Sequence, residues 1–170
     1  MLGDFTPQKY LFFTLGIGKG AEVIAHAPAP DHPIGKIGCL LDIIGGTSTD
    51  SLKNNLFRHP AAECNRQLAF KTLNRQINTL SDSWLVHQDN FVIYDAPRPP
   101  DQKIPPKADI ILTDNPAVSL FMRYADCVPI LLYDPDHHAI GLAHAGWKGT
   151  VMKVAKTAVE AMGTRYGTRP

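Results

Sequence analysis

The chain has 170 residues and a mass of 18.7 kDa, which is enough for one domain with a sizeable core and short for two. Lys and Arg number 17 against 16 for Asp and Glu, so a net charge of +1 provides no electrostatic reason to expect nucleic acid or an anionic membrane as partner. The apolar runs are far too short to cross a bilayer, no export leader is visible, and three cysteines without CxxC spacing suit a reducing compartment. We therefore expect a single cytoplasmic domain over residues 1–170, with a small molecule as its substrate.

Two proline-rich segments, 26–33 and 96–107, are predicted to be surface loops, because proline interrupts both helices and central strands. Between them, apolar residues among polar neighbours over 51–77 favour one or two helices. Short runs of branched and aromatic residues at 84–87 and 91–94 predict two strands before the second loop.

Four short apolar runs rich in branched residues follow Lys107: ADIILTD, VSLFMRYA, VPILLYD and AIGLAHA. Turn-forming residues separate them, so we expect them to be strands of one largely buried sheet. The last two runs flank the sequence Asp-Pro-Asp-His-His at 134–138, in which the proline is placed to start a tight turn. These two strands should therefore form an antiparallel hairpin.

The period of the apolar residues changes after Gly149 and predicts an amphipathic helix over 150–162, with Thr150 as N-cap and Gly163 as C-terminal stop. Its inward face should carry Val151, Val154, Ala158 and Met162, and its outward face Lys153, Lys156 and Glu160. Strands followed by a packed helix indicate a mixed α/β or α+β fold.

The predicted hairpin brings a cysteine and a histidine together. Taken alone, Cys127 is more typical of a small buried hydrophobe, whereas His144 lies among small apolar neighbours and needs a partner for each ring nitrogen. If the turn is centred between Pro135 and Asp136, Cys127 falls directly opposite His144, with Cβ atoms roughly 4.5 to 5.5 Å apart. That separation suits a shared metal ion, and a bulge in the turn would shift the register.

A third residue is needed to choose a chemistry, because one Cys and one His also suit a nucleophile and its base. His87 ends the predicted strand WLVH, and another strand of the same sheet could bring it close to the pair. By spacing alone, a surface histidine at a strand end is the simpler interpretation.

The segment ADIILTDNPAVSLFMRYADCVPILLYDP, followed by IGLAHAGWKGT, resembles the central signature of the YfiH family, also called the polyphenol oxidase or laccase-domain family. WLVHQDNFVI is similar to the family's upstream segment with its first histidine, although Leu85 stands where the family commonly has glutamine. The resemblance implies a layered α/β/β/α sandwich. Members usually continue well beyond the equivalent of Pro170, so it also implies a fragment that lacks the family's C-terminal part.

In this family a His, a Cys and a second His bind zinc, and the resemblance transfers these roles to His87, Cys127 and His144. Three protein ligands leave one position open, as in catalytic zinc sites, and copper is a possible alternative ion. The implied reactions are phosphorolysis of adenosine, inosine, guanosine or methylthioadenosine, and deamination of adenosine. The partners would be purine nucleosides and phosphate, with Arg123 as candidate phosphate contact and Asp126 as candidate orienting residue.

Three other functions stay open. A copper-dependent, laccase-like polyphenol oxidase ranks lower, because a single three-ligand site lacks the additional histidine pairs of a multicopper oxidase. A metal-free hydrolase or deamidase would use Cys127 as nucleophile and His144 as base, without an evident need for His87. An inactive truncated binding module would keep the metal site without catalysis.

Overall fold

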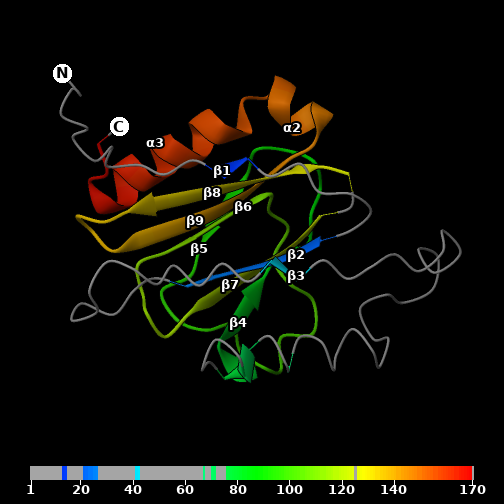
Figure 1. The fold of residues 1–170 in the computed structure, drawn as a ribbon, viewed down its shortest axis with the longest axis vertical. Helices are drawn as coiled ribbons and strands as arrows, with labels where there is room; N and C mark the ends of the chain where they lie inside the picture. The colour runs from blue at the N-terminus through cyan, green and yellow to red at the C-terminus, as the bar shows by residue number, and fades with distance from the viewer. Residues whose placement is uncertain are drawn as a thin grey trace, which may run out of the picture.

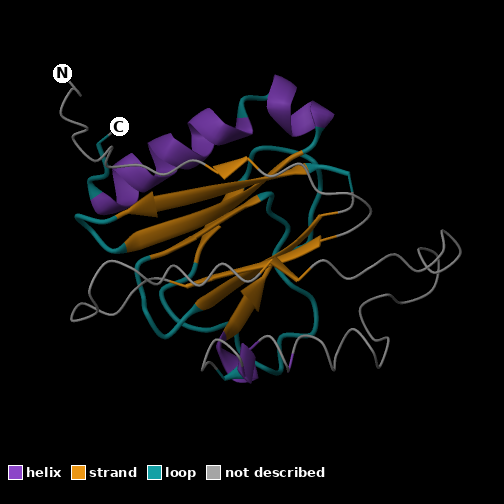
Figure 2. Ribbon diagram, in the orientation of Figure 1, coloured by secondary structure: helices purple, strands orange, loops and turns teal. Residues whose placement is uncertain are grey.

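The structure is a computed structural model, and it describes residues 76–124 and 126–169 together with shorter pieces at 13–14, 21–26, 41–42, 67 and 70–71. Two β-sheets pack face to face, and two helices cover the outer face of one of them (Figures 1 and 2). The described residues thus form helix, sheet and sheet layers. The predicted mixed α/β fold class is confirmed.

The first sheet has five strands in the order β1-β8-β9-β6-β5, and it holds the predicted hairpin at its centre. Only β5 and β6 pair in parallel, and the other neighbours are antiparallel. The strands are β1 (Phe13–Thr14), β8 (Val128–Asp134), β9 (Ala139–Ala145), β6 (Ile110–Thr113) and β5 (Phe91–Ile93).

The second sheet has four strands in the order β3-β2-β7-β4, of which only β4 and β7 pair in parallel. The strands are β3 (Leu41–Asp42), β2 (Ala21–His26), β7 (Ser119–Tyr124) and β4 (Leu80–Asp82). The prediction that all four central runs share one sheet is therefore wrong for β7. After β6 the chain turns at Asn115, whose side-chain oxygen accepts the N–H of Ala117 at 2.8 Å, and then enters the other layer.

The core has two layers because β6 and β9 are buried on both faces. Between the sheets lie Tyr94, Ile111, Val118, Leu120, Met122, Tyr124, Ile140 and Leu142. Between the five-stranded sheet and the helices lie Ile110, Leu112, Leu132, Ala139, Ala143, Val154, Ala158, Ala161 and Met162. A strand with two buried faces needs apolar residues at consecutive positions, which explains the near-continuous apolar runs in the sequence.

The predicted strand over 84–87 is wrong. The chain instead forms a 3-10 turn, η3 (Ile77–Thr79), the strand β4, and a single bridge between Trp84 and Lys107. His87 follows in a bend with a left-handed φ of 59°. The extended run ends because the backbone N–H groups of residues 86–88 bond to the side chain of Asp109 instead of a neighbouring strand.

Residues 96–107 connect β5 to β6 without helix or strand, apart from the bridge at Lys107. The other proline-rich segment, over 26–33, lies outside the described residues except for His26, which ends β2. The predicted helices over 51–77 also lie largely outside them, although residues 67, 70 and 71 are helical.

The C-terminal segment forms two helices, α2 (Trp147–Val151) and α3 (Val154–Tyr166), where the sequence predicted one from Thr150. Lys153 takes a left-handed φ of 64° between them, which breaks the helical path and leaves Val151 74% exposed. The prediction of an inward Val151 is wrong, whereas Val154, Ala158 and Met162 are buried as predicted.

The C-terminal stop also differs from the prediction. Helix α3 continues past Gly163 and ends at Gly167, whose φ of 80° is the left-handed conformation common at helix ends. Among the described residues, no helix combines the length and apolar character that crossing a membrane requires.

Candidate metal centre

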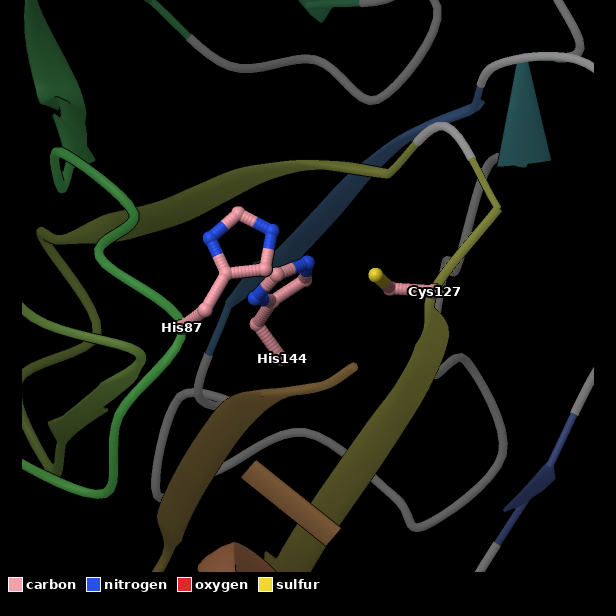
Figure 3. A group of neighbouring side chains, drawn as sticks. All are labelled: His87, Cys127 and His144. Carbon is pink, nitrogen blue, oxygen red and sulfur yellow. The ribbon is translucent and has the colours of Figure 1, made fainter. Parts of the chain in front are cut away.

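Three side chains singled out by the sequence converge at one end of the five-stranded sheet (Figure 3). His144 lies near the end of β9, Cys127 lies in the bend just before β8, and His87 lies in the loop after the Trp84 bridge. One ligand atom from each residue lies within 4.8 Å of the others. His144 is buried, Cys127 is half-buried and His87 is exposed, so the cluster opens to solvent on the His87 side.

The hairpin register explains how Cys127 approaches His144. Pro129 pairs with His144 and Val128 with Ala145, so the prediction that Cys127 lies directly opposite His144 is wrong. Four residues, 135–138, lie in the turn, which moves the register by two positions. A two-residue shift keeps every side chain on its own face. Cys127 therefore reaches His144 diagonally, and the next position of the register places it opposite Gly146.

Gly146 leaves room among the three side chains. A Cβ atom at this position would lie 3.0 Å from Cys127 Sγ, 3.3 Å from His87 Cδ2 and 3.9 Å from His144 Cε1. Its backbone angles, φ −73° and ψ 171°, are accessible to any residue. The glycine is therefore required here for space and not for backbone freedom.

His144 is oriented by a buried carboxylate. Its Nδ1 lies 2.8 Å from Oδ1 of Asp109, whose side chain is completely buried, and Nδ1–H donates to it. Nε2 is then the ring nitrogen left to bind a ligand. The edge of the His87 ring approaches His144 with the ring centroids 4.9 Å apart and the planes at 80°.

Asp109 is a residue that the sequence reasoning missed, because it lies within the apolar run ADIILTD. Burial acts to raise its pKa, but hydrogen bonds from the side chain of His144 and from three backbone N–H groups outweigh this effect and lower it. The available signal was the register of β6 and β9, in which Ile110 pairs with Ala143, so that Asp109 faces His144 one position further on. An acidic residue beside a buried histidine is a typical orienting pair.

The surroundings of Cys127 favour the neutral thiol. Burial, and then the nearby carboxylates of Asp126 and Asp109, raise the pKa of Cys127. A thiol in this environment stays protonated at neutral pH unless a cation is nearby. A bound metal ion supplies such a charge and removes the thiol proton.

The two candidate substrate-binding residues lie on β7 and in the bend before β8. Arg123 is on β7, where it pairs with Glu22 of β2, and its guanidinium carbon lies 5.8 Å from the centre of the Phe121 ring. Asp126 is exposed in the bend beside Cys127. Their roles in substrate binding stay predictions.

The donor set fits a divalent transition metal. Two imidazoles and one thiolate are ligands for zinc, and the same set also suits copper. Two ligands at 2.0 to 2.3 Å from an ion lie at most about 4.6 Å apart, close to the 4.8 Å within which the three atoms lie. The side chain missing at Gly146 keeps the intervening space free.

Comparisons with known proteins identify a matching family model and similar sequences. The family model described as multi-copper polyphenol oxidoreductase laccase matches residues 58–170. A purine nucleoside phosphorylase of Deinococcus radiodurans is 47% identical over 64 residues, which cover 38% of this chain and 25% of that protein. The purine nucleoside phosphorylase YlmD of Bacillus subtilis is 42% identical over 62 residues, which cover 36% of this chain and 22% of that protein.

A solved structure shows the same fold. The crystal structure of the Bacillus licheniformis hypothetical protein YfiH superimposes with a TM-score of 0.58 at 30% identity, covering 62% of this chain and 41% of that one. The chain thus aligns with about a quarter of the length of these curated relatives and with less than half of the solved one. From the family match over residues 58–170, the fold and the shared signature, this chain belongs to the laccase-domain, or YfiH, family.

Proposed function

We propose that this chain carries the zinc-binding part of a purine nucleoside phosphorylase, with His87, Cys127 and His144 as the protein ligands. The observation that carries the proposal is the convergence of three ligand atoms within 4.8 Å of one another. Relatives that share up to half of the aligned residues are named purine nucleoside phosphorylases, which supports the reaction class.

The three residues differ in exposure, and each would have a different role at the metal site. His144 presents Nε2 from the buried side, because its Nδ1–H is held by Asp109. Cys127 supplies the negative charge, and the exposed His87 closes the set on the solvent side, where a substrate enters. Zinc held by three protein ligands keeps a fourth position open and acts there as a Lewis acid.

The substrates proposed are phosphate and a purine nucleoside such as adenosine, inosine, guanosine or methylthioadenosine. In phosphorolysis a phosphate oxygen forms a bond to ribose C1′ while the bond from C1′ to the purine nitrogen breaks, and the base leaves with a proton. The phosphate needs a cationic partner, for which Arg123 is the candidate, and Asp126 is the candidate for orienting the bound group. Adenosine deamination is proposed as a second reaction of the same site.

A copper-dependent polyphenol oxidase is the second candidate function, and the description of the matching family favours it. The same three ligands would bind the copper ion. The described residues contain one group of three possible ligands, whereas oxygen reduction by a multicopper enzyme uses several copper ions. Oxidation of a phenol by the copper-loaded chain, measured beside nucleoside cleavage by the zinc-loaded chain, separates the two functions.

A metal-free hydrolase built on Cys127 and His144 is the third candidate. Burial, and then the carboxylates near Cys127, hold the pKa of the thiol above its usual value, which weakens it as a nucleophile. Replacing His87 distinguishes this hydrolase from the zinc enzyme, because a Cys and His dyad does not use this residue.

The test compares His87→Ala with wild type and with His137→Ala, a matched control on a histidine in the β8–β9 turn. The first readout is the zinc content of protein purified without added metal, and the second is phosphate-dependent cleavage of inosine and adenosine. We expect His87→Ala to lose most of both, and His137→Ala to keep both.

Each other outcome points to a different function. Full activity of His87→Ala after exhaustive chelation would contradict the zinc proposal and favour the cysteine hydrolase. Stoichiometric zinc without turnover in the wild type would indicate a binding module. Zinc content is read first because it does not depend on parts of the relatives with which this chain does not align.

A further inference from the structure

One buried carboxylate contacts both histidines of the candidate metal centre. Oδ1 of Asp109 accepts Nδ1–H of His144 at 2.8 Å and the backbone N–H of His87 at 2.9 Å. Oδ2 accepts the backbone N–H of Val86 at 3.1 Å and that of Gln88 at 2.9 Å. The residue has no exposed surface, so these four donors take the place of water around both oxygens.

For His144 this contact selects a tautomer. Both oxygens of Asp109 accept backbone N–H groups, as an ionised carboxylate does, so the facing Nδ1 carries the proton and Nε2 keeps its lone pair. A backbone hydrogen bond joins the same two residues, because the N–H of His144 donates to the carbonyl oxygen of Asp109 at 2.8 Å. Side chain and main chain thus place His144 relative to the same residue.

For His87 the same carboxylate defines the backbone conformation. His87 has a left-handed φ of 59°, which is uncommon for a residue other than glycine. Three successive N–H groups, from residues 86, 87 and 88, point at one carboxylate and form a concave anion-binding nest. Without the Asp109 carboxylate in this nest, the loop loses the hydrogen bonds that hold His87 in the strained conformation. That conformation directs the His87 side chain toward His144.

We propose that Asp109 is the positioning residue of the centre, setting the tautomer of His144 and the loop conformation of His87 through one carboxylate. This inference rests on the proposed metal site for its functional meaning, while the positioning itself can be measured in the metal-free protein. Asp109 is not one of the three candidate ligands, and in this proposal it acts through the two histidines.

Asp134, at the turn end of the β8–β9 hairpin, provides a matched control for Asp109. Asp134 is also buried, and its carboxylate contacts Nδ1 of His137 at 2.8 Å and accepts the backbone N–H groups of Asp136 and His137. It pairs with Ala139, five residues from His144 along β9 and therefore roughly 17 Å away. Asp134→Asn thus removes the same kind of bonds without touching the centre.

The experiment measures two properties of the wild type, Asp109→Asn and Asp134→Asn. Long-range ¹H–¹⁵N NMR spectra of the metal-free proteins, assigned with His144→Gln, report which nitrogen of His144 carries the proton. Competition with a chromophoric chelator reports zinc affinity. We expect the Nδ1–H form in wild type and Asp134→Asn, and its loss in Asp109→Asn together with about 10- to 100-fold weaker zinc binding.

The outcomes separate the positioning role from the proposed function. A folded Asp109→Asn that keeps both the Nδ1–H form and wild-type zinc affinity overturns the inference, as does an Nε2–H form in the wild type. If Asp109→Asn does not fold, the tautomer of His144 in the wild type alone tests the inference, and the Nδ1–H form supports it. A wild type with the Nδ1–H form and no zinc affinity supports the positioning while overturning the proposed metal function.

Discussion

Gly146 shows how a single residue can control access to the candidate metal centre. A Cβ atom added at this position would lie 3.0 Å from Cys127 Sγ and 3.3 Å from His87 Cδ2, and both distances are shorter than ordinary van der Waals contact. Gly146→Ala should therefore push the candidate ligands apart. We expect at least about tenfold weaker zinc binding, within the range seen when the support of a metal site is altered, measured by chelator competition.

The thermal midpoint of Gly146→Ala should change little, because alanine adopts φ −73° and ψ 171° without strain. Gly163→Ala provides the control, since Gly163 lies in α3 and an added Cβ would meet only the carbonyl oxygen of Thr168, at 3.2 Å. Wild-type zinc affinity in Gly146→Ala would contradict the assignment of this space to an ion.

At the scale of the element, α3 supports the five-stranded sheet through one face. Val154 is 1% exposed and packs with Ile110 and Leu112 of β6, whereas Val151 of α2, three residues earlier, is 74% exposed. Val154→Asp should destabilise the protein by about 3 kcal/mol or more, because it places an unpaired charge in the core. Val151→Asp should stay within about 0.5 kcal/mol of wild type.

Urea unfolding of the two variants makes this comparison with the substitution held constant. Lys156→Ala adds a second surface control, since Lys156 is 65% exposed and pairs with Glu160 at 3.4 Å across one helical turn. Such exposed pairs contribute about 0.3 to 0.5 kcal/mol. Equal unfolding midpoints for Val154→Asp and Val151→Asp would refute the packing described for α3.

At the scale of the whole molecule, Asp134 links the β8–β9 hairpin to the C-terminal segment. Its buried carboxylate accepts Oγ1–H of Thr168 and contacts Nδ1 of His137. Burial acts to raise the pKa of Asp134, but hydrogen bonds from Thr168 and His137 outweigh it and lower the pKa below its usual value. A lowered pKa in the folded state means that this carboxylate stabilises the fold above the unfolded pKa of about 3.9.

That contribution should be lost as the pH falls through the folded pKa of Asp134, which is lower still. Asp134→Asn should cost roughly 1.5 to 3 kcal/mol at pH 7, the range for bonds to a charged group, and progressively less below about pH 4. Urea unfolding at pH 7 and at pH 3 measures both differences. Asp101→Asn, at an exposed position in the 96–107 loop, should match wild type at each pH, and a pH-independent cost for Asp134→Asn would contradict the linkage.

Much of the central architecture could be predicted from the sequence alone. The strands from β6 to β9, the hairpin and the inward positions Val154, Ala158 and Met162 all follow from apolar periodicity and turn formers, which are local properties. The family, and with it the three candidate ligands, follows from the signature around ADC and HAGW. These signals suffice because burial on one or both faces of an element leaves a direct pattern in the chain.

Only the tertiary structure decided how the pieces meet. The register of β8 and β9 depends on the backbone path of the turn, where His138 takes a φ of 52°, and this path places Cys127 opposite Gly146 instead of His144. The role of Asp109 depends on N–H groups from residues more than twenty positions earlier, so no local pattern marks it. Periodicity encodes which face of an element is buried, whereas the contacts of a buried polar group depend on distant segments that only the folded chain brings together.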